Sequence, residues 1–178
     1  EQGGPAMLSR RDVLGLMAAA PALAACPASA AAIACGTPWR DWHGFVQRHV
    51  QDDGRVVDHA HPDLRSTSES QSYALFFALA DNNPVLFDRI LAWTRRHLCG
   101  GRPDLNLPAW LWGQGKDGQW QVQDPNSASD ADLWFVYALL EADRLWRKPE
   151  YRADALALVE QRILQREVSP LAIAERKP

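Results

Sequence analysis

The sequence predicts an all-α protein. Five segments in the range 39–167 carry apolar residues three or four positions apart, which is the spacing of one helix face. Serine, asparagine and proline residues stand where several of these helices would begin. No segment of useful length shows the pattern of a strand, and no fixed-period repeat is present.

The first expected helix spans 39–50, and the second begins at Ser68. The apolar residues of the first helix are Trp39, Trp42, Phe45, Val46 and Val50. Residues 51–65 are rich in Asp, Gly, His and Pro, which predicts a loop. Ser68 and Gln71 fit a capping box in front of the apolar run 73–79.

The third expected helix begins at Asn83-Pro84, because proline is well tolerated in the first helical turn. Its predicted inner side consists of Leu86, Ile90, Trp93, Thr94 and Leu98. Gly100-Gly101 is expected to end it. Residues 102–126 have several turn residues and no sustained period, so they predict a long loop of the kind that is often functional.

A fourth helix is expected over 130–146, and Pro149 opens a fifth that reaches about Glu167. The predicted inward residues of the fourth helix are Leu133, Val136, Tyr137, Leu140 and Leu145. Those of the fifth helix are Leu156, Val159, Ile163 and Leu164.

The composition is that of a globular protein with one domain. Apolar residues make up 47% of the 178 residues and charged residues 23%. The net charge of −3 comes from interspersed acidic and basic residues, so we expect no nucleic acid partner, which would need a basic face. Eight tryptophans fit either core packing or stacking on the flat apolar faces of sugar rings.

The N-terminal part resembles a secretory signal. Residues 1–6 precede Met7 and are interpreted as upstream or added residues. The segment 7–32 holds Ser9-Arg10-Arg11 and a short Ala-rich apolar stretch, which is typical of twin-arginine export. We therefore expect a periplasmic or secreted protein. Cleavage after an Ala-x-Ala site competes with lipidation of Cys26, and we favour simple cleavage because Ala-rich signals produce lipobox-like tetrapeptides by chance.

Export implies an oxidising compartment, in which Cys35 and Cys99 could be joined. Two cysteines far apart in sequence do not establish a distance. A disulfide and two independent thiols are both compatible with the sequence.

Two acidic segments stand at expected helix starts. Glu69 lies in a first helical turn, where a carboxylate is favoured by the helix dipole whatever its function. Asp130 and Asp132 lie at the start of the fourth helix, where they could simply cap it. Because they are two residues apart, their side chains should point in different directions.

Two further motifs have competing interpretations. Trp110 and Trp112, two apart in the expected loop, either plug the core or form a platform for sugar stacking. His59-Ala60-His61 could ligate a metal, but no further His cluster follows. We expect these histidines to face solvent, and we expect no metal and no cofactor.

Together, three segments resemble glycoside hydrolase family 8. They are Ser68-Glu69-Ser70-Gln71-Ser72-Tyr73, Leu107-Pro108-Ala109-Trp110-Leu111-Trp112-Gly113 and Ser127-Ala128-Ser129-Asp130-Ala131-Asp132-Leu133. Within the family the likeness is greatest to the periplasmic endoglucanases of bacterial cellulose synthesis. It places the N-terminal part of a catalytic domain at 36–168, followed by an unrelated tail at 169–178.

The resemblance implies an incomplete (α/α)6 barrel, with about five of twelve helices, that hydrolyses β-1,4-glucan with inversion. It gives Glu69 the role of general acid and Asp130 that of a carboxylate that holds and distorts the sugar. The positions that it assigns to substrate binding are Trp110, Trp112, Tyr73 and Gln71. The implied partner is cellulose or a cello-oligosaccharide, with association with the cellulose synthase machinery as a further hypothesis, and we expect a monomer.

The chain departs from the family pattern in two ways. Ser70 stands where the family usually has glycine, beside the acid. The family's catalytic base has no counterpart before Val168, so we expect a truncated chain that hydrolyses little by itself. The alternatives are a non-catalytic glucan-binding relative and a helical interaction lipoprotein anchored through Cys26. The enzymatic hypothesis requires that Glu69 and Asp130, at separate helix starts, meet at one groove.

Overall fold

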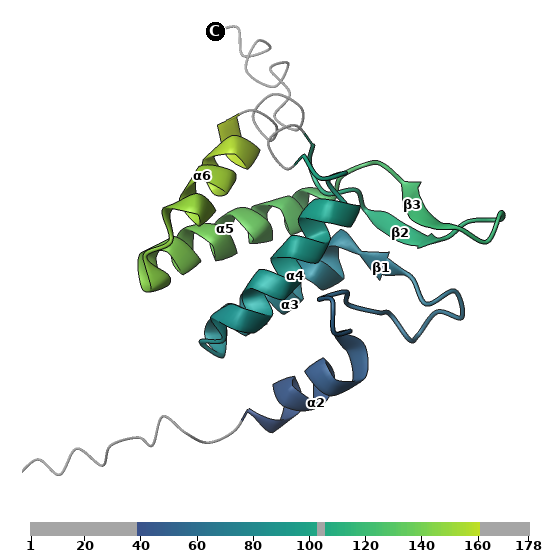
Figure 1. Cartoon of the computed structure of the whole chain (residues 1–178), viewed down its shortest axis with the longest axis horizontal. Helices are drawn as coiled ribbons and strands as arrows, with labels where there is room; N and C mark the ends of the chain where they lie inside the picture. Colours follow the sequence, from purple (N-terminus) through teal and green to yellow (C-terminus); the bar gives the residue numbers. More distant parts are fainter. Residues whose placement is uncertain (1–38, 103–105, 161–178) are drawn as a thin grey trace, which may run out of the picture. The chain divides into compact units, whose positions relative to one another are not determined.

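The computed structural model describes residues 39–102 and 106–160, in which five helices and three short strands occur (Figure 1). In chain order they are α2 (Arg40–His49), β1 (Ser66–Thr67), α3 (Ser68–Ala80), α4 (Pro84–His97), β2 (Leu111–Gln114), β3 (Trp120–Asp124), α5 (Ser129–Trp146) and α6 (Pro149–Leu158). The expected signal segment 7–32, with Cys26, and the expected tail 169–178 lie outside the described residues. Among the helices that are described, none is long and apolar enough to span a bilayer.

Helix α3 contacts both α4 and α5, and α5 in turn contacts α6 (Figure 1). Their shared core includes the fully buried side chains of Leu75, Phe87, Ile90 and Phe135. Phe87 meets the ring of Tyr151 edge-on at 5.2 Å, which joins α4 to α6. Each of the five predicted helices therefore has a counterpart, whereas the predicted continuation of the fifth to Glu167, with Ile163 and Leu164, lies outside the described residues.

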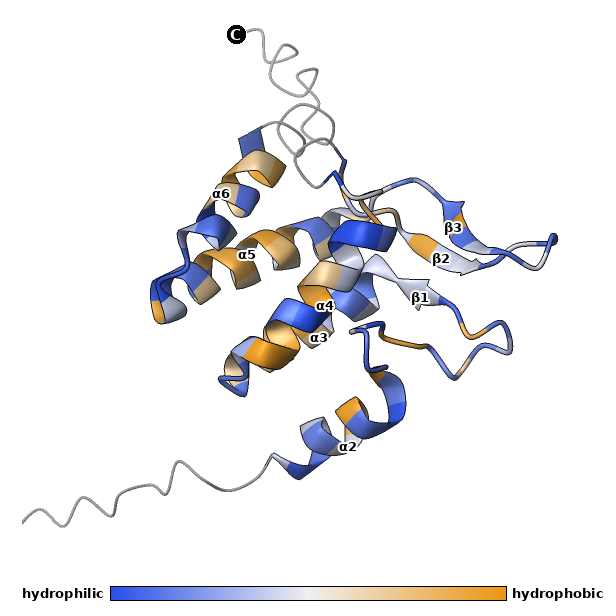
Figure 2. Ribbon diagram, in the orientation of Figure 1, coloured by the Kyte–Doolittle hydropathy of each residue, from blue (hydrophilic) through white to orange (hydrophobic). Residues whose placement is uncertain are grey.

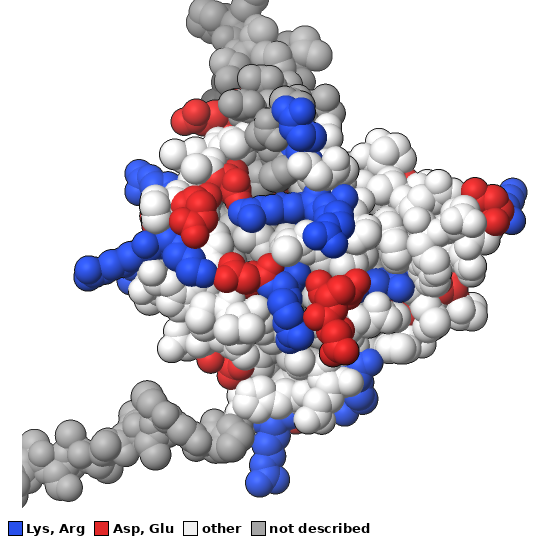
Figure 3. All heavy atoms as spheres, viewed as in Figure 1, with Lys and Arg blue, Asp and Glu red and all other residues white. Residues whose placement is uncertain are grey.

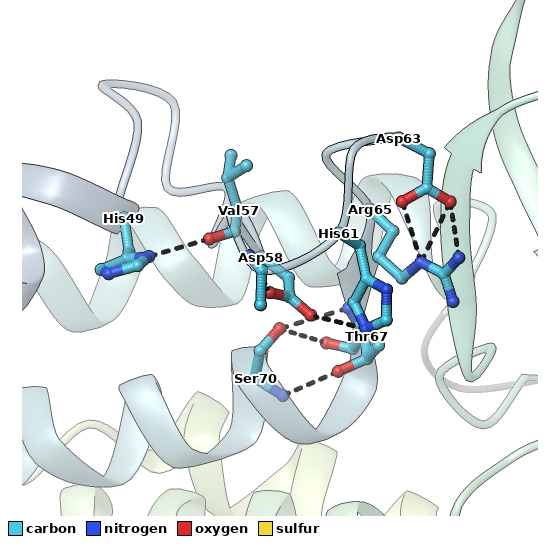
Figure 4. A network of polar contacts seen from close by, with 9 residues as sticks. His49, Val57, Asp58, His61, Asp63, Arg65, Thr67 and Ser70 are labelled. Atoms are coloured by element: carbon cyan, nitrogen blue, oxygen red, sulfur yellow. Dashed lines mark hydrogen bonds and ion pairs between the residues drawn. The ribbon is translucent and has the colours of Figure 1, made fainter.

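The start of α3 is fixed by a capping box, one residue earlier than predicted. Thr67 is the N-cap: its hydroxyl accepts a hydrogen bond from the Ser70 backbone N–H at 3.2 Å, and Ser70 Oγ accepts one from the Thr67 N–H at 3.2 Å (Figure 4). The predicted pair of Ser68 and Gln71 is wrong, because Thr67 ends the extended strand β1 and already has the dihedral angles of an N-cap. Ser70, where the resemblance leads us to expect glycine, thus completes the cap.

Helix α4 follows its sequence signals. Asn83 Oδ1 accepts a hydrogen bond from the Leu86 N–H at 3.0 Å, and Pro84 occupies the first turn. All five residues of the predicted inner side are buried. Beyond the helix, Gly100 and Gly101 adopt φ values of 59° and 76°, the left-handed conformation that glycine tolerates best.

The inner face of α5 is not the one predicted. Its buried side is formed by small or well-packed residues: Ala131, Asp132, Phe135, Ala138, Leu139 and Ala142. Of the five residues predicted to point inward, Leu133, Tyr137, Leu140 and Leu145 are exposed, Leu133 by 58%. Apolar residues occur on more than one side of this helix (Figure 2), so the helical period could not select the face.

One inward assignment in α6 is also wrong, because Leu156 is exposed whereas the neighbouring Ala155 is buried. Among the apolar residues of the first predicted helix, Trp42 is buried and Phe45 packs against the core, whereas Trp39 lies just before α2 and is exposed.

A small antiparallel sheet occupies part of the segment predicted as a long loop. Its strands lie in the order β1-β2-β3, and β2 and β3 form a hairpin (Figure 1). The strands have two, four and five residues, too short and too polar for an alternating pattern to reveal them. The sheet lies beside the ends at which α3 and α5 begin, so it belongs to the same region as the two acidic helix starts (Figure 1).

Charged side chains of both signs alternate on the surface shown in Figure 3. Ion pairs link α4 to α6: Lys148 Nζ, just before α6, lies 2.8 Å from Asp88 Oδ2, and Arg95 pairs with Asp154. Cys99 is buried, and this burial raises the pKa of its thiol to about 12, so that it stays protonated at neutral pH. Because Cys35 lies outside the described residues, the pairing of the two cysteines stays open.

Candidate active site

The two acidic residues singled out from the sequence occupy equivalent places in two neighbouring helices. Glu69 is the second residue of α3, and Asp130 is the second residue of α5. Helices α3 and α5 pack against each other, and both start beside the sheet (Figure 1). The backbone N–H groups of both first turns therefore provide a positive electrostatic environment in the same region.

Glu69 is half-buried and held by one hydrogen bond to each carboxyl oxygen. The indole Nε1–H of Trp110 donates to Oε1 at 2.9 Å. The hydroxyl of the neighbouring Ser68 donates to Oε2 at 3.2 Å. The Glu69 side chain is thus oriented from both sides.

Trp110 is itself fixed by its backbone. Its carbonyl accepts a hydrogen bond from the Ser68 N–H at 3.0 Å, and its own N–H donates to the Asn126 carbonyl at 2.6 Å. Ser68 opens α3, and Asn126 lies shortly before α5. The backbone of Trp110 is therefore hydrogen-bonded both to the first residue of α3 and to a residue shortly before α5.

Tyr73 links α3 to the carboxylate of Asp130 in α5. It follows Glu69 by one helical turn, so the two side chains share one side of α3. Its hydroxyl donates to Asp130 Oδ2 at 2.9 Å. This hydrogen bond, followed by burial and by the negative charges of Asp130 and Glu69, raises the pKa of the Tyr73 phenol, so it remains a hydrogen-bond donor at neutral pH.

Open, aromatic-walled hollows flank the Tyr73–Asp130 pair. One, of about 430 Å³, is lined by Phe76, Asp130, Leu133, Trp134 and Tyr137. Another, of about 450 Å³, is lined by Trp39, Asp41, Trp42, Phe45, Ser70, Tyr73, Ala74 and Phe77. A carboxylate beside exposed rings suits a sugar, which presents hydroxyl groups and flat apolar faces.

Trp134 was missed by the sequence analysis. It is partly exposed, and its ring meets that of Tyr73 edge-on at 6.1 Å. The available signal was its position four residues after Asp130 on a helix, which places the two on one side of α5. Because this side of α5 was expected to face the core, Trp134 was not predicted as a site residue.

Trp112 does not lie beside Glu69 as a sugar platform. Only 8% of it is exposed, and it packs with Trp93 and Leu98 in a second core cluster. A register irregularity between Leu111 and Trp112 breaks the strand geometry that would place residues two apart on one face. Trp112 is therefore part of a core cluster in the described residues, and its assignment to substrate binding stays a prediction.

The side chain of Gln71 is fully buried and bonds to residues other than Glu69, and its assignment to substrate binding stays a prediction. Its Oε1 accepts a hydrogen bond from the Val56 N–H at 2.6 Å. Its Nε2 donates to Thr94 Oγ1 at 3.0 Å and to the Gly54 carbonyl at 3.3 Å. Gln71 thus joins α3 to α4 and to the loop after α2.

Replacing Gln71 by leucine should lower the free energy of unfolding by about 1–3 kcal/mol, because the buried Val56 N–H loses its acceptor. Urea denaturation of the full chain measures this change. Gln47→Leu, on the exposed side of α2, is the control and should change stability by less than about 0.5 kcal/mol. Equal effects of the two substitutions would contradict the structural role of Gln71.

The aspartate pair and the two loop histidines lie as the sequence predicts. Asp132 is buried whereas Asp130 is exposed, so the two carboxylates point in different directions. His59 and His61 are both exposed, and His61 Nε2 lies 3.6 Å from Asp58 Oδ2 (Figure 4). Over 39–102 and 106–160, no three His, Cys, Asp or Glu side chains are grouped so that they could hold a metal ion.

Comparison with known proteins identifies relatives over most of the chain. Residues 14–172 match Glycosyl hydrolases family 8. An endoglucanase of Xanthomonas axonopodis pv. citri is 59% identical over 146 residues, which are 81% of this chain and 38% of the relative. An endoglucanase of Escherichia coli K12 is 44% identical over 130 residues, 73% of this chain and 35% of that relative. The chain thus spans little more than a third of these proteins.

Solved structures of endoglucanases are also similar to this chain. The crystal structure of an endo-1,4-D-glucanase from Vibrio fischeri ES114 superposes with a TM-score of 0.68 at 50% identity, covering 71% of this chain and 36% of that one. The structure of an endo-β-1,4-glucanase from Acetobacter xylinum gives a TM-score of 0.56 at 29% identity, covering 67% and 36%.

Proposed function

The chain belongs to glycosyl hydrolase family 8 and has part of its (α/α)6 barrel, and from this premise we propose that it supplies the general acid of the active site of an endo-β-1,4-glucanase. The observation that carries the proposal is the arrangement of Glu69, Tyr73 and Asp130 on adjoining helix starts. The Tyr73 hydroxyl of α3 donates a hydrogen bond to Asp130 of α5, and an aromatic hollow lies beside Asp130.

In this proposal Glu69 is the general acid. It protonates the glycosidic oxygen as the bond to the anomeric carbon breaks, which is the step that a poor leaving group such as a sugar hydroxyl requires. Asp130, oriented by Tyr73, accepts hydrogen bonds from sugar hydroxyls at the scissile site and holds the ring in a distorted form. The exposed Trp134 provides apolar surface for the sugar.

Inverting hydrolysis also needs a base that activates water on the opposite face of the sugar, about 6.5–9.5 Å from the acid. The family resemblance assigns this role to an Asp in the second half of the barrel. We therefore propose that the chain alone hydrolyses little, and that activity requires the remainder of the barrel.

The substrate that we propose is a β-1,4-glucan, supported by the relatives named endoglucanases. Export through a twin-arginine-type signal, action in cellulose synthesis beside the synthase machinery and a monomeric state remain predictions. Fractionation of cells that carry the full-length gene tests the first of these.

A chimera tests the proposed function. The 146 aligned residues of this chain replace their counterparts in the Xanthomonas endoglucanase, which supplies the rest of the barrel. The chimera should release reducing sugar from carboxymethylcellulose, and ¹H NMR of cellopentaose hydrolysis should show the α-anomer first, because inversion converts a β-linkage into an α-product.

The parental Xanthomonas protein and the 178-residue chain are the two controls. The chain alone should release little or no sugar. A folded chimera without activity, in an assay in which the parent is active, would refute the proposal. Initial formation of the β-anomer would refute the inverting mechanism.

A further inference from the structure

The hydrogen bond between Trp110 and Glu69 has a consequence for the direction of proton transfer. We propose that Trp110 is a positioning residue for the acid, and that its indole N–H makes Oε2 of Glu69 the oxygen that carries the transferred proton. This inference rests on the proposed function of Glu69. It gives Trp110 a role that differs from the sugar stacking expected from the sequence.

The two oxygens of Glu69 have chemically different partners. Oε1 accepts from Trp110 Nε1 at 2.9 Å, and an indole N–H is a donor that can never accept. Oε2 faces Ser68 Oγ at 3.2 Å, and a hydroxyl can donate or accept. A proton on Oε1 would meet a second donor, whereas a proton on Oε2 meets a group that can turn to accept it. The neutral acid is therefore protonated on Oε2.

The position of the indole is determined by the backbone around it. The Trp110 carbonyl accepts from the Ser68 N–H at 3.0 Å, next to Glu69 in the chain. Beyond it, β2 pairs with β1 in the register Thr67–Leu111 and Ser66–Trp112. Because the donor and the carboxyl group are anchored to the same short sheet, the hydrogen bond need not be assembled when substrate binds.

The proton passes from Glu69 Oε2 to the glycosidic oxygen while the bond from that oxygen to the anomeric carbon breaks. A water molecule, which loses a proton to the base, supplies the hydroxyl group that the anomeric carbon gains. Glu69 is left as a carboxylate that keeps the Trp110 hydrogen bond, and solvent exchange returns the proton from the base to the acid.

The test is Trp110→Phe in the chimera, which removes the donor and keeps an aromatic ring. Two substrates are compared: cellopentaose, whose leaving sugar needs a proton, and 2,4-dinitrophenyl β-cellobioside, whose phenolate leaves without one. We expect kcat on cellopentaose to fall about 10- to 100-fold, part of the 10²–10⁴-fold that general acids contribute. On the dinitrophenyl substrate kcat should fall less than about 3-fold, with KM little changed on both.

Trp120→Phe is the matched control, because this exposed ring stacks on Trp112 at 5.0 Å and does not touch Glu69. It should leave both substrates unaffected. An equal loss on both substrates in Trp110→Phe, or no loss on either, would overturn the positioning role. Inactivity of the unsubstituted chimera on cellopentaose would instead count against the proposed function itself.

A second measurement does not depend on activity or on the folding of the Trp110 variant. In the full chain labelled with ¹⁵N-tryptophan, the Trp110 indole N–H signal should move upfield in Glu69→Ala, because a hydrogen bond to a carboxylate deshields the proton. The indole signal of Trp120 should stay in place. An unmoved Trp110 signal would overturn the proposal.

Discussion

Replacing Glu69 by glutamine should lower kcat of the chimera on cellopentaose about 10²- to 10⁴-fold, the range that a general acid contributes. Glutamine has the same shape, and its amide oxygen can still accept the Trp110 indole N–H that now bonds Oε1. It has no proton to transfer to the glycosidic oxygen. Because substrate contacts are retained, KM should change little, and steady-state kinetics separate the two effects.

The control for this substitution is Glu150→Gln. Glu150 is the second residue of α6, as Glu69 is the second residue of α3, so both substitutions remove a negative charge from the same helical position. Only Glu69→Gln should affect hydrolysis, and the dinitrophenyl substrate should be largely spared. A loss below about 10-fold on cellopentaose would mean that Glu69 is not the acid.

The helices were predictable because their signals are local. Asn83-Pro84 specifies the start of α4 through backbone chemistry alone, and the stripe from Leu86 to Leu98 is buried as predicted. The buried face of α5 was not predictable, since it depends on which neighbouring helices pack against it. Ala131 and Ala138 allow close approach of α3, which leaves Leu133 exposed.

The residues of the candidate site also differ in how far the sequence predicts them. Glu69 and Asp130 were identified through motifs, and their helix-start positions follow from sequence. Trp112 and Gln71 stand in the same motifs, yet one packs into a core cluster and the other into a buried hydrogen-bond network. Motif membership indicates proximity to a site, whereas the direction of a side chain depends on strand irregularities and packing partners that sequence spacing does not encode.

Gly54→Ala should be the most destabilising single substitution considered for this chain. Gly54 has a φ of 96°, and a Cβ atom there would lie 2.2 Å from the Arg89 carbonyl oxygen and 2.7 Å from the Ile90 backbone nitrogen. The dihedral angle alone costs about 1–3 kcal/mol for a residue with a side chain. Moving α4 away adds to this, so we expect a loss of more than about 3 kcal/mol in the free energy of unfolding, measured by urea denaturation of the full chain.

Gly118→Ala separates the two contributions, because Gly118 has a φ of 78° but its nearest neighbour to a new Cβ is Gln114 Nε2 at 3.8 Å. Only the conformational cost of about 1–2 kcal/mol applies there. Equal losses in the two variants would show that Gly54 does not approach α4 closely in solution. The close approach matters for the site, because the Gly54 carbonyl accepts from Gln71 Nε2 at 3.3 Å and Gln71 anchors the first turn of α3. A displaced Gly54 should therefore disturb Glu69 from a distance, through the helix that carries it.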